Sequence, residues 1–351
     1  MRWENVYVAG TGVWLAEPES ARTAVEEGRY DAEQAEQDDL ISVCVADEST
    51  APPDMAVQAA TTAVKRSGLD ASDVDLLIHS GIWFQGVEMW PAASYVAGHA
   101  LGRDATAFGV QQECNAAMGA LELAARQIDG RPDGAAVVTT ADRFGAPLIK
   151  RWSSEPGFVY GDGATAIVLS GRGGVARLLS TASGSDNAME AVVRGAELKA
   201  VPTGEPLDLS GRVSHFMRTN AGGFRAATQR VGAVVKTVVD TALSDAGIGR
   251  DEVARVVVLA SGRSRMQWQV PQLLDMPFEK STWDFARRVG HLGAGDQIAA
   301  LNHLLEHRQL AVGDRVLMVG GGSGFSCTCA VLEITGQPDW APVGLGEALA
   351  A

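Results

Sequence analysis

Cys114 is the residue of this chain whose surroundings could make a thiol nucleophilic. It lies between a short extended run, 107–110, and an alanine-rich stretch of strong helix formers. At such a strand-to-helix junction, unpaired backbone N–H groups and the positive end of the helix dipole would lower the pKa of the thiol and favour the thiolate. Most free cysteines are small buried hydrophobic residues, so this segment alone leaves a structural role open beside a catalytic one.

His291 is the residue that could serve as a base for this thiol. It stands in Gly290-His291-Leu292-Gly293, shortly before a helix predicted over 297–306. A thiol and an imidazole brought together form a catalytic pair, because the imidazole can accept a proton during acyl transfer. Asp296 would either orient the imidazole or stabilise the N-terminus of the helix. A histidine at a helix start can itself be purely structural.

An internal repeat would bring these two residues together. In the first half, predicted strands at 74–78 and 135–140 flank the cysteine segment and its helix. In the second half, predicted strands at 255–259 and 316–319 flank the histidine and its helix in the same order. A duplication of this kind places two helix N-termini at a pseudo-two-fold axis, where the thiol and the imidazole would meet.

The alternation of apolar strands with helices predicts an α/β fold. A first strand at 6–10 is followed by an acidic, irregular stretch at 16–40, which we expect to be a surface excursion. A helix at 54–67 follows, started by two prolines and stopped by a glycine. Strands that are apolar throughout are typical of a parallel-rich sheet covered by helices on both faces. From the repeat we predict two halves, 1–172 with the cysteine and 173–351 with the histidine and a glycine loop.

The composition limits the partners and the compartment. A formal net charge of −14 argues against nucleic acid or an anionic membrane surface as the main partner. The 4 cysteines show no Cys-x-x-Cys pair and no metal-ligand spacing, so we expect no metal and a reducing environment. No apolar run is long enough to span a bilayer, and the N-terminal residues show no signal-peptide core. These features predict a cytoplasmic protein.

The order and spacing of four segments resemble the thiolase superfamily, and within it the ketoacyl-synthase-III-like branch. The segments are the Cys114 stretch, 160–164, 290–293 and 320–325. The resemblance implies a five-layered αβαβα sandwich of two duplicated halves, normally a homodimer. It also implies that the cysteine takes an acyl group from a CoA or acyl-carrier-protein thioester, which is a substrate, with no further cofactor. The backbone N–H groups of Cys114 and Ser323 would form the oxyanion hole, contributing about 3–4 kcal/mol per donor.

Two departures from the family pattern bear on the reaction. Condensing members carry a histidine after the strand that matches 255–259, and an asparagine after the glycine that matches Gly290. Those side chains stabilise the enolate that forms when a malonyl thioester loses carbon dioxide. Here the first place reads Ala260-Ser261-Gly262 and the second holds His291. Neither alanine nor serine replaces an imidazole donor, so decarboxylative condensation loses half of its machinery.

The resemblance therefore implies an acyltransferase. Cys114 would carry the acyl group, and His291 would act as general base toward a hydroxyl, an amine or a carrier thiol. The pattern around His291 resembles ketoacyl-synthase-III-like acyltransferases of antibiotic pathways, while some relatives with a histidine here start an aromatic polyketide. The acceptor stays open. The alternatives are a decarboxylative condensing enzyme that primes a polyketide and a non-catalytic partner subunit.

The same resemblance suggests where the substrates bind. Bulky residues after the strand at 74–78 lie where the acyl pocket and the dimer loop of the family meet, although an aromatic cluster is more often core than pocket. The predicted acyl or acceptor pocket comprises Trp83, Phe84, Met89, Trp90 and Ser261. Condensing relatives bind CoA with an arginine and a tryptophan. These two residues have no clear counterparts around 39–46, which favours a carrier protein as the acyl donor. Arginines between the halves would form a solvated face or receive an acidic carrier: Arg212, Arg218, Arg225 and Arg230.

Overall fold

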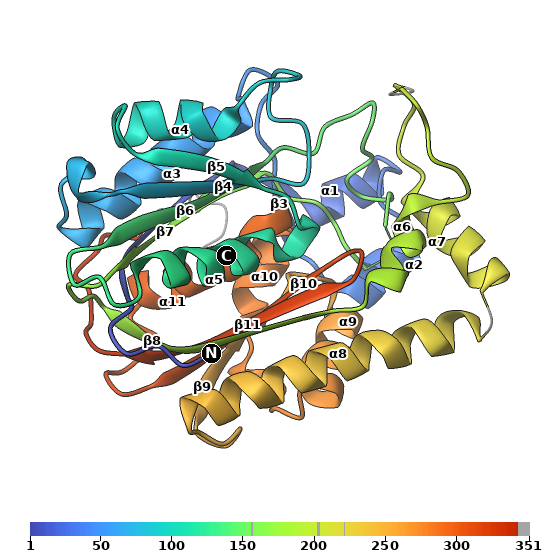
Figure 1. The fold of residues 1–351 in the computed structure, drawn as a ribbon. Coiled ribbons are helices and arrows are strands. Elements are labelled where there is room, and N and C mark those ends of the chain that lie inside the picture. The colour runs from blue at the N-terminus through green and yellow to red at the C-terminus, as the bar shows by residue number, and fades with distance from the viewer. Residues whose placement is uncertain (156, 202–203, 221, 343–351) are drawn as a thin grey trace.

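Nine strands form one continuous sheet at the centre of the fold (Figure 1). The structure is a computed structural model that describes residues 1–342 except 156, 202, 203 and 221. The strands are ordered β5-β4-β6-β7-β1-β8-β11-β10-β9. Their bounds are β1 Tyr7–Leu15, β4 Leu76–Ser80, β5 Thr106–Val110, β6 Ala135–Asp142, β7 Gly163–Ser170, β8 Ala176–Ser185, β9 Val253–Val257, β10 Arg315–Gly322 and β11 Ser326–Ile334. A separate pair consists of β2 (Pro18–Ser20) and β3 (Ser42–Cys44).

The sheet consists of one group of strands from each part of the chain. Strands β5, β4, β6, β7 and β1 come from residues 7–170, and strands β8, β11, β10 and β9 come from residues 176–334. The groups meet where β1 pairs with β8, through Tyr7↔Arg177 and Val8↔Ala176. The exact division into 1–172 and 173–351 stays a prediction. The pairing of β1 with β8 joins the two groups of strands and does not mark a domain boundary.

The prediction of a parallel-rich sheet is wrong. Parallel pairing is found for β4 with β5, β4 with β6 and β9 with β10, whereas every other neighbouring pair in the described sheet is antiparallel. All residues of β4, β6 and β7 are buried, whichever way their neighbours run. A continuous apolar run therefore reports that helices cover both faces of the sheet and does not report strand direction.

The helices form three layers around the two groups of strands, which confirms the five-layered arrangement (Figure 1). Helices α3 (Pro52–Ser67) and α4 (Ala92–Ala100) cover the outer side of the first group, and α8 (Gly223–Ala246) covers the outer side of the second. Helices α5 (Ala116–Ile128) and α11 (Asp296–Glu306) lie between the groups. The remaining helices are α1 Ala21–Glu26, α2 Ala32–Asp38, α6 Ala191–Arg194, α7 Leu209–Thr219, α9 Arg263–Gln267 and α10 Trp283–Val289. Across the described ranges, no helix has the length and apolarity that a bilayer crossing requires.

Helix α3 shows how closely the layers pack. Its prolines stand at the N-terminus and Gly68 ends it in the left-handed region with φ 71°, as predicted. On its inner side, a Cβ on Gly12 of β1 would lie 2.2 Å from the carbonyl oxygen of Ala59. Glycine at this position lets the backbone of the helix approach the backbone of the strand.

The stretch 16–40 is not the irregular surface excursion that its acidic composition predicted. It contains β2, α1 and α2, and Ala24, Tyr30 and Asp38 are fully or almost fully buried. Tyr30 packs against Trp152 at 5.1 Å between ring centroids and donates a hydrogen bond to Asp38 at 2.7 Å. The prediction failed because the few residues that bury this stretch are separated by many charged ones.

His79 of β4 is a structural histidine whose burial makes stability depend on pH. Its ring nitrogens lie 2.9 Å from Thr139 Oγ1 and 3.1 Å from Gln85 Oε1, and burial lowers its pKa to about 4. Between pH 6.5 and 4, His79 is protonated in the unfolded chain but stays neutral in the folded protein. The free energy of unfolding therefore falls as the pH falls, by about 3 kcal/mol in total. Burial raises the pKa of Asp142 to about 7, which acts in the opposite direction.

Asp142 is present in both the wild type and the His79→Asn variant, so its contribution to the pH dependence of stability cancels when the two are compared. We expect the free energy of unfolding in urea, measured from pH 4 to 7, to rise less steeply with pH in the variant than in the wild type. The difference in slope should correspond to the uptake of about one proton on unfolding. Identical slopes would show that folded His79 titrates normally.

Candidate active site

The thiol of Cys114 and the imidazole of His291 are neighbours. Cys114 lies in a 3₁₀ turn, Glu113–Asn115, between β5 and α5. His291 follows α10 and precedes α11, and its Nε2 lies 3.1 Å from the sulfur. The structure thus brings together two residues that are 177 positions apart in the sequence. The distance is within hydrogen-bonding reach of a sulfur atom, so a proton can pass between the two groups.

Asp296 fixes the imidazole from the other side. Its Oδ2 lies 2.6 Å from His291 Nδ1 and accepts a hydrogen bond from the backbone N–H of Ala260 at 2.7 Å. Its Oδ1 accepts from the backbone N–H of Leu292 at 2.7 Å. These donors hold the carboxylate so that Nδ1 of the ring is protonated and Nε2 points at the sulfur. Cys114, His291 and Asp296 have the arrangement of a nucleophile, a base and an orienting acid.

The electrostatics of the pair differ from the expectation for an exposed thiol. Burial raises the pKa of the Cys114 thiol, and the neighbouring His291 opposes that rise. The predicted lowering by the helix N-terminus is therefore wrong in direction, because loss of solvation outweighs it. Burial by itself would lower the pKa of His291, but the negative charges of Asp296 and Cys114 raise it well above 6.5. The site therefore stabilises a proton on the imidazole.

Replacement of Asp296 by asparagine should change the pH profile as well as the rate. Without the carboxylate the pKa of His291 falls, so the acid limb of activity moves to lower pH. The maximal rate should fall by about 10²–10⁴-fold, since the ring loses its orienting partner and the charge that stabilises the imidazolium. The measurement is kcat/KM for acyl transfer against pH, with the melting temperature as a control for folding. A slower variant with an unshifted acid limb would assign Asp296 only to helix stability.

The loop between Tyr160 and β7 supports the histidine. The backbone N–H of His291 donates to Val159 O at 2.8 Å, and the N–H of Gly161 donates to His291 O at 2.9 Å. The ring of Tyr160 lies 5.6 Å from the imidazole. Asp162, which is fully buried, anchors this loop to Arg151 at 2.9 Å. This loop therefore lies against His291.

The glycine-rich end of β10 packs closely on the cysteine turn. A Cβ on Gly322 would lie 2.4 Å from Gln112 O, and one on Gly320 would lie 2.5 Å from Asn115 Oδ1. Ser323 and Cys114 line the same cavity. The close approach explains the glycines, while the oxyanion hole formed by the N–H groups of Cys114 and Ser323 remains a prediction.

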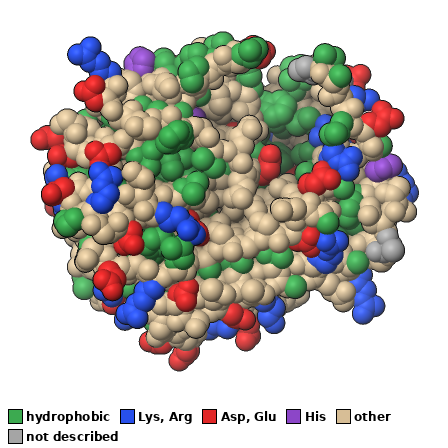
Figure 2. All heavy atoms as spheres, viewed as in Figure 1, with side chains coloured by type: hydrophobic (Ala, Val, Ile, Leu, Met, Phe, Trp, Pro, Cys, Tyr) green, Lys and Arg blue, Asp and Glu red, His purple; other side chains and the backbone are tan. Residues whose placement is uncertain are grey.

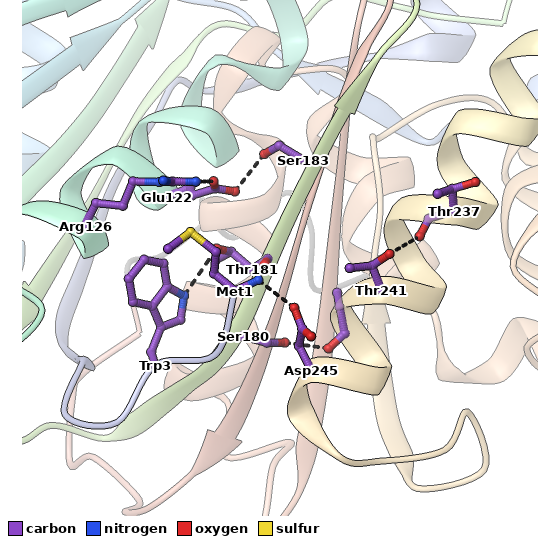
Figure 3. Close-up of polar contacts among 11 residues, drawn as sticks. Met1, Trp3, Glu122, Arg126, Ser180, Thr181, Ser183, Thr237, Thr241 and Asp245 are labelled. Atoms are coloured by element: carbon purple, nitrogen blue, oxygen red, sulfur yellow. Dashed lines mark hydrogen bonds and ion pairs between the residues drawn. The ribbon is translucent and has the colours of Figure 1, made fainter.

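A polar network, buried at Asn115 and Thr328, holds the cysteine turn to the second group of strands. Asn115 accepts a hydrogen bond from the backbone of Thr328 at 3.0 Å and donates to its side chain at 3.1 Å. Ser183 lies 2.8 Å from Thr328. It donates to Glu122 of α5 at 2.7 Å, and Glu122 in turn pairs with Arg126 (Figure 3). The residue after the nucleophile is thereby fixed from both sides.

A cavity of about 610 Å³ opens beside the sulfur. Figure 2 shows this face hollowed near α6 and α7, with apolar side chains inside the hollow and charged ones around it. The walls are mostly aliphatic and aromatic, and they include residues of α6 and α7 that sequence patterns did not assign to a site, such as Val192, Leu209 and Val213. These residues carry no chemical signal, and their position depends on how this segment folds over the catalytic pair.

The predicted pocket is only partly the observed one. Trp83 lines the cavity, but the described lining does not include Phe84, Met89, Trp90 or Ser261. Phe84 and Met89 are exposed, and Trp90 packs on Tyr95 at 5.2 Å between ring centroids. Ser261 is buried and accepts a hydrogen bond from Gln269 at 3.0 Å. Glu113 and Glu155, which sequence patterns did not assign to a site, also line the cavity.

Comparisons with known proteins agree with this geometry. The family 3-oxoacyl-(acyl-carrier-protein) synthase III matches at residues 108–187, and the family of its C-terminal part matches at residues 243–334. The structure of the acyltransferase ChlB3 has a TM-score of 0.91 and 38% identity, and the match covers 96% of this chain and 100% of that one. The mycobacterial beta-ketoacyl-(acyl-carrier-protein) synthase III of Mycolicibacterium paratuberculosis is 25% identical over 291 residues, 82% of each chain. The fold is shared with 3-oxoacyl-(acyl-carrier-protein) synthase III of Aquifex aeolicus, with a TM-score of 0.75 and 21% identity over 93% of this chain and 99% of that one.

Proposed function

Because the chain belongs to the thiolase superfamily, in its ketoacyl-synthase-III-like branch, we propose that it transfers an acyl group from a carrier thioester through Cys114 to a heteroatom acceptor. The acceptor is a hydroxyl, an amine or a carrier thiol. The setting is the biosynthesis of a secondary metabolite such as an antibiotic or polyketide. The proposal rests on the contacts of His291 with Cys114 and with Asp296, and on the position of Cys114 and His291 in the cavity lining.

The reaction proceeds in two half-reactions. In the first, the Cys114 thiolate attacks the thioester carbonyl, the carrier thiolate leaves and takes a proton from His291, and an acyl-cysteine remains. In the second, His291 Nε2 takes the proton of the acceptor, the acceptor attacks the acyl carbonyl, and the Cys114 thiolate leaves. The backbone N–H groups of Cys114 and Ser323 stabilise the oxyanion in both.

The neighbourhood of Ser261 favours acyl transfer over decarboxylative condensation. Leu259 contributes an apolar side chain to the cavity, the N–H of Ala260 is used by Asp296, and the Ser261 hydroxyl accepts from Gln269. Of these three residues only Ser261 has a side-chain donor, and Ser261 is not part of the described cavity lining. A base that is paired with a carboxylate, as His291 is, suits removal of a proton from an acceptor.

A dimer and a carrier-protein donor complete the proposal. Strand β5 is at the edge of the described sheet, and Phe108 on it is 57% exposed. An exposed edge with a large apolar side chain fits pairing with a second copy of the chain. Arg194 and Arg265 lie on the cavity wall and are exposed, where they can receive the phosphate of a phosphopantetheinyl arm.

Intact-mass measurement after incubation with a panel of acyl thioesters tests the proposed nucleophile. The wild type should gain one acyl mass, and the Cys114→Ala variant should gain none. Addition of hydroxyl, amine or carrier-thiol acceptors should remove the adduct. Absence of an adduct across the panel would contradict the proposal, and release of carbon dioxide from a malonyl carrier would identify a condensing enzyme instead. A non-catalytic partner subunit would show neither product.

A further inference from the structure

The side chains of Glu155 and Tyr160 form a polar pair in the cavity that the two half-reactions do not use. The Tyr160 hydroxyl donates a hydrogen bond to Glu155 Oε2 at 2.8 Å, and both residues line the cavity together with Cys114. Burial, followed by the charges of Glu155 and Cys114, raises the pKa of Tyr160. The pair is therefore within electrostatic reach of the sulfur that would carry the acyl group.

The surroundings of this pair are apolar. Tyr160 packs on Phe144 with 4.6 Å between ring centroids and shares a hydrophobic cluster with further cavity residues. Those residues are Ile82, Trp83, Ile149, Leu207 and Leu209. Hydrocarbon attached to the cysteine can bury against these walls. A carboxylate on the same wall is costly unless it is supplied with hydrogen-bond donors.

The carboxylate of Glu155 can accept more hydrogen bonds than the described residues donate to it. A carboxylate offers about four acceptor positions, and among the described residues only Tyr160 donates to this one. If the pair served only to satisfy the tyrosine hydroxyl, a neutral acceptor would be sufficient. Water or a substrate group must supply the remaining donors. A substrate group that does so is recognised by a charge-assisted hydrogen bond.

The arginines of the cavity wall make contacts of their own. Arg194 pairs with Glu190 at 2.8 Å, and Arg212 donates to Val193 O at 3.2 Å. Arg265 lies over the ring of Phe158, 4.6 Å from its centroid. An acyl group that ends in a carboxylate would therefore meet the like charge of Glu155.

We propose that Glu155, oriented by Tyr160, selects apolar acyl groups that carry a hydroxyl, and rejects both plain hydrocarbon acyl groups and carboxylated ones such as malonyl. This inference rests on the proposed acyl-cysteine at Cys114. It names the substrate class of that site. It predicts, on a ground separate from the missing histidine, that malonyl units are poor substrates.

Matched thioesters test this selection. The probes are N-acetylcysteamine thioesters of hexanoic acid, of hexanoic acids hydroxylated on carbon 3, 4, 5 or 6, and of adipic acid. The rate of adduct formation on Cys114 is followed by intact mass. In the wild type, at least one hydroxylated isomer should react about 10–100-fold faster than hexanoyl, and adipoyl should be slowest. Glu155→Gln keeps an acceptor for Tyr160 but removes the charge, so the preference should shrink to a few-fold and adipoyl should gain about tenfold.

Two further variants separate recognition from structure. Glu26→Gln makes the same chemical change at the exposed pair with Arg22, outside the described cavity lining, and should leave the preference unchanged. Tyr160→Phe frees the carboxylate from its orienting bond and should weaken the preference without reversing it. Equal slowing of all thioesters by Glu155→Gln, or a wild type that does not distinguish the probes, would overturn the inference while the adduct itself still supports the proposed function. Absence of any adduct in the wild type would overturn both.

Discussion

Replacement of His291 by alanine is expected to slow acyl transfer by about 10²–10⁴-fold, the range found when a general base is removed. His291 opposes the effect of burial on the Cys114 thiol, so its loss leaves a thiol with a higher pKa and a smaller thiolate fraction. The acceptor also loses the Nε2 atom that would take its proton. Both half-reactions should therefore slow.

Single-turnover experiments resolve the two steps. Formation of the acyl adduct on Cys114 reports the first step, and its decay after addition of acceptor reports the second. His79→Asn is the matched control, because His79 is buried and lies outside the described cavity lining. It should retain near wild-type rates at neutral pH. Retention of more than a tenth of the wild-type rate by His291→Ala would contradict the role of His291 as base.

Replacement of Asp162 by alanine is expected to cost about 3–5 kcal/mol of unfolding free energy, as the loss of one partner of a buried ion pair does. Asp162 accepts hydrogen bonds from the backbone of Ala46 at 2.9 Å and of Phe144 at 2.8 Å, and from Arg151 at 2.9 and 3.1 Å. Alanine would leave the Arg151 guanidinium, 11% exposed, without this partner. A loss of this size is a large fraction of the total stability of a typical protein.

Urea unfolding of the single and double variants measures this effect. The double variant Asp162→Ala with Arg151→Leu should recover part of the loss, because no uncompensated charge remains buried. The control is Glu190→Gln at the exposed pair with Arg194, which should cost about 0–1 kcal/mol. If Asp162→Ala costs no more than this control, the buried pair does not hold the loop beside His291.

Sequence patterns predicted the elements around Cys114 and His291 well. Helix α3 begins at the two prolines and ends at Gly68, where local backbone preferences decide. The repeat predicted that the segments of Cys114 and His291 occupy equivalent places, and their side chains lie 3.1 Å apart. Local sequence patterns did not predict the buried elements of 16–40. Burial there depends on residues far away in the sequence, such as Trp152.

The cavity was the part of the site that sequence patterns predicted least well. Trp83 was the one predicted pocket residue found in the described lining, whereas Phe84 and Met89 face solvent. Glu155 and the apolar residues of α6 and α7 gave no signal in the sequence. Which side chains face a cavity depends on how loops and short helices pack over it, and no local periodicity encodes that packing.

The sequence by itself determined the family, the α/β repeat and the pairing of a thiol with an imidazole, because these depend on residue types at fixed spacings along the chain. Tertiary structure alone decided the strand directions, the rise in the pKa of Cys114 and the presence of Glu155 beside an apolar wall. Desolvation and long-range charge act through space. They are set by neighbours that only the folded chain brings together.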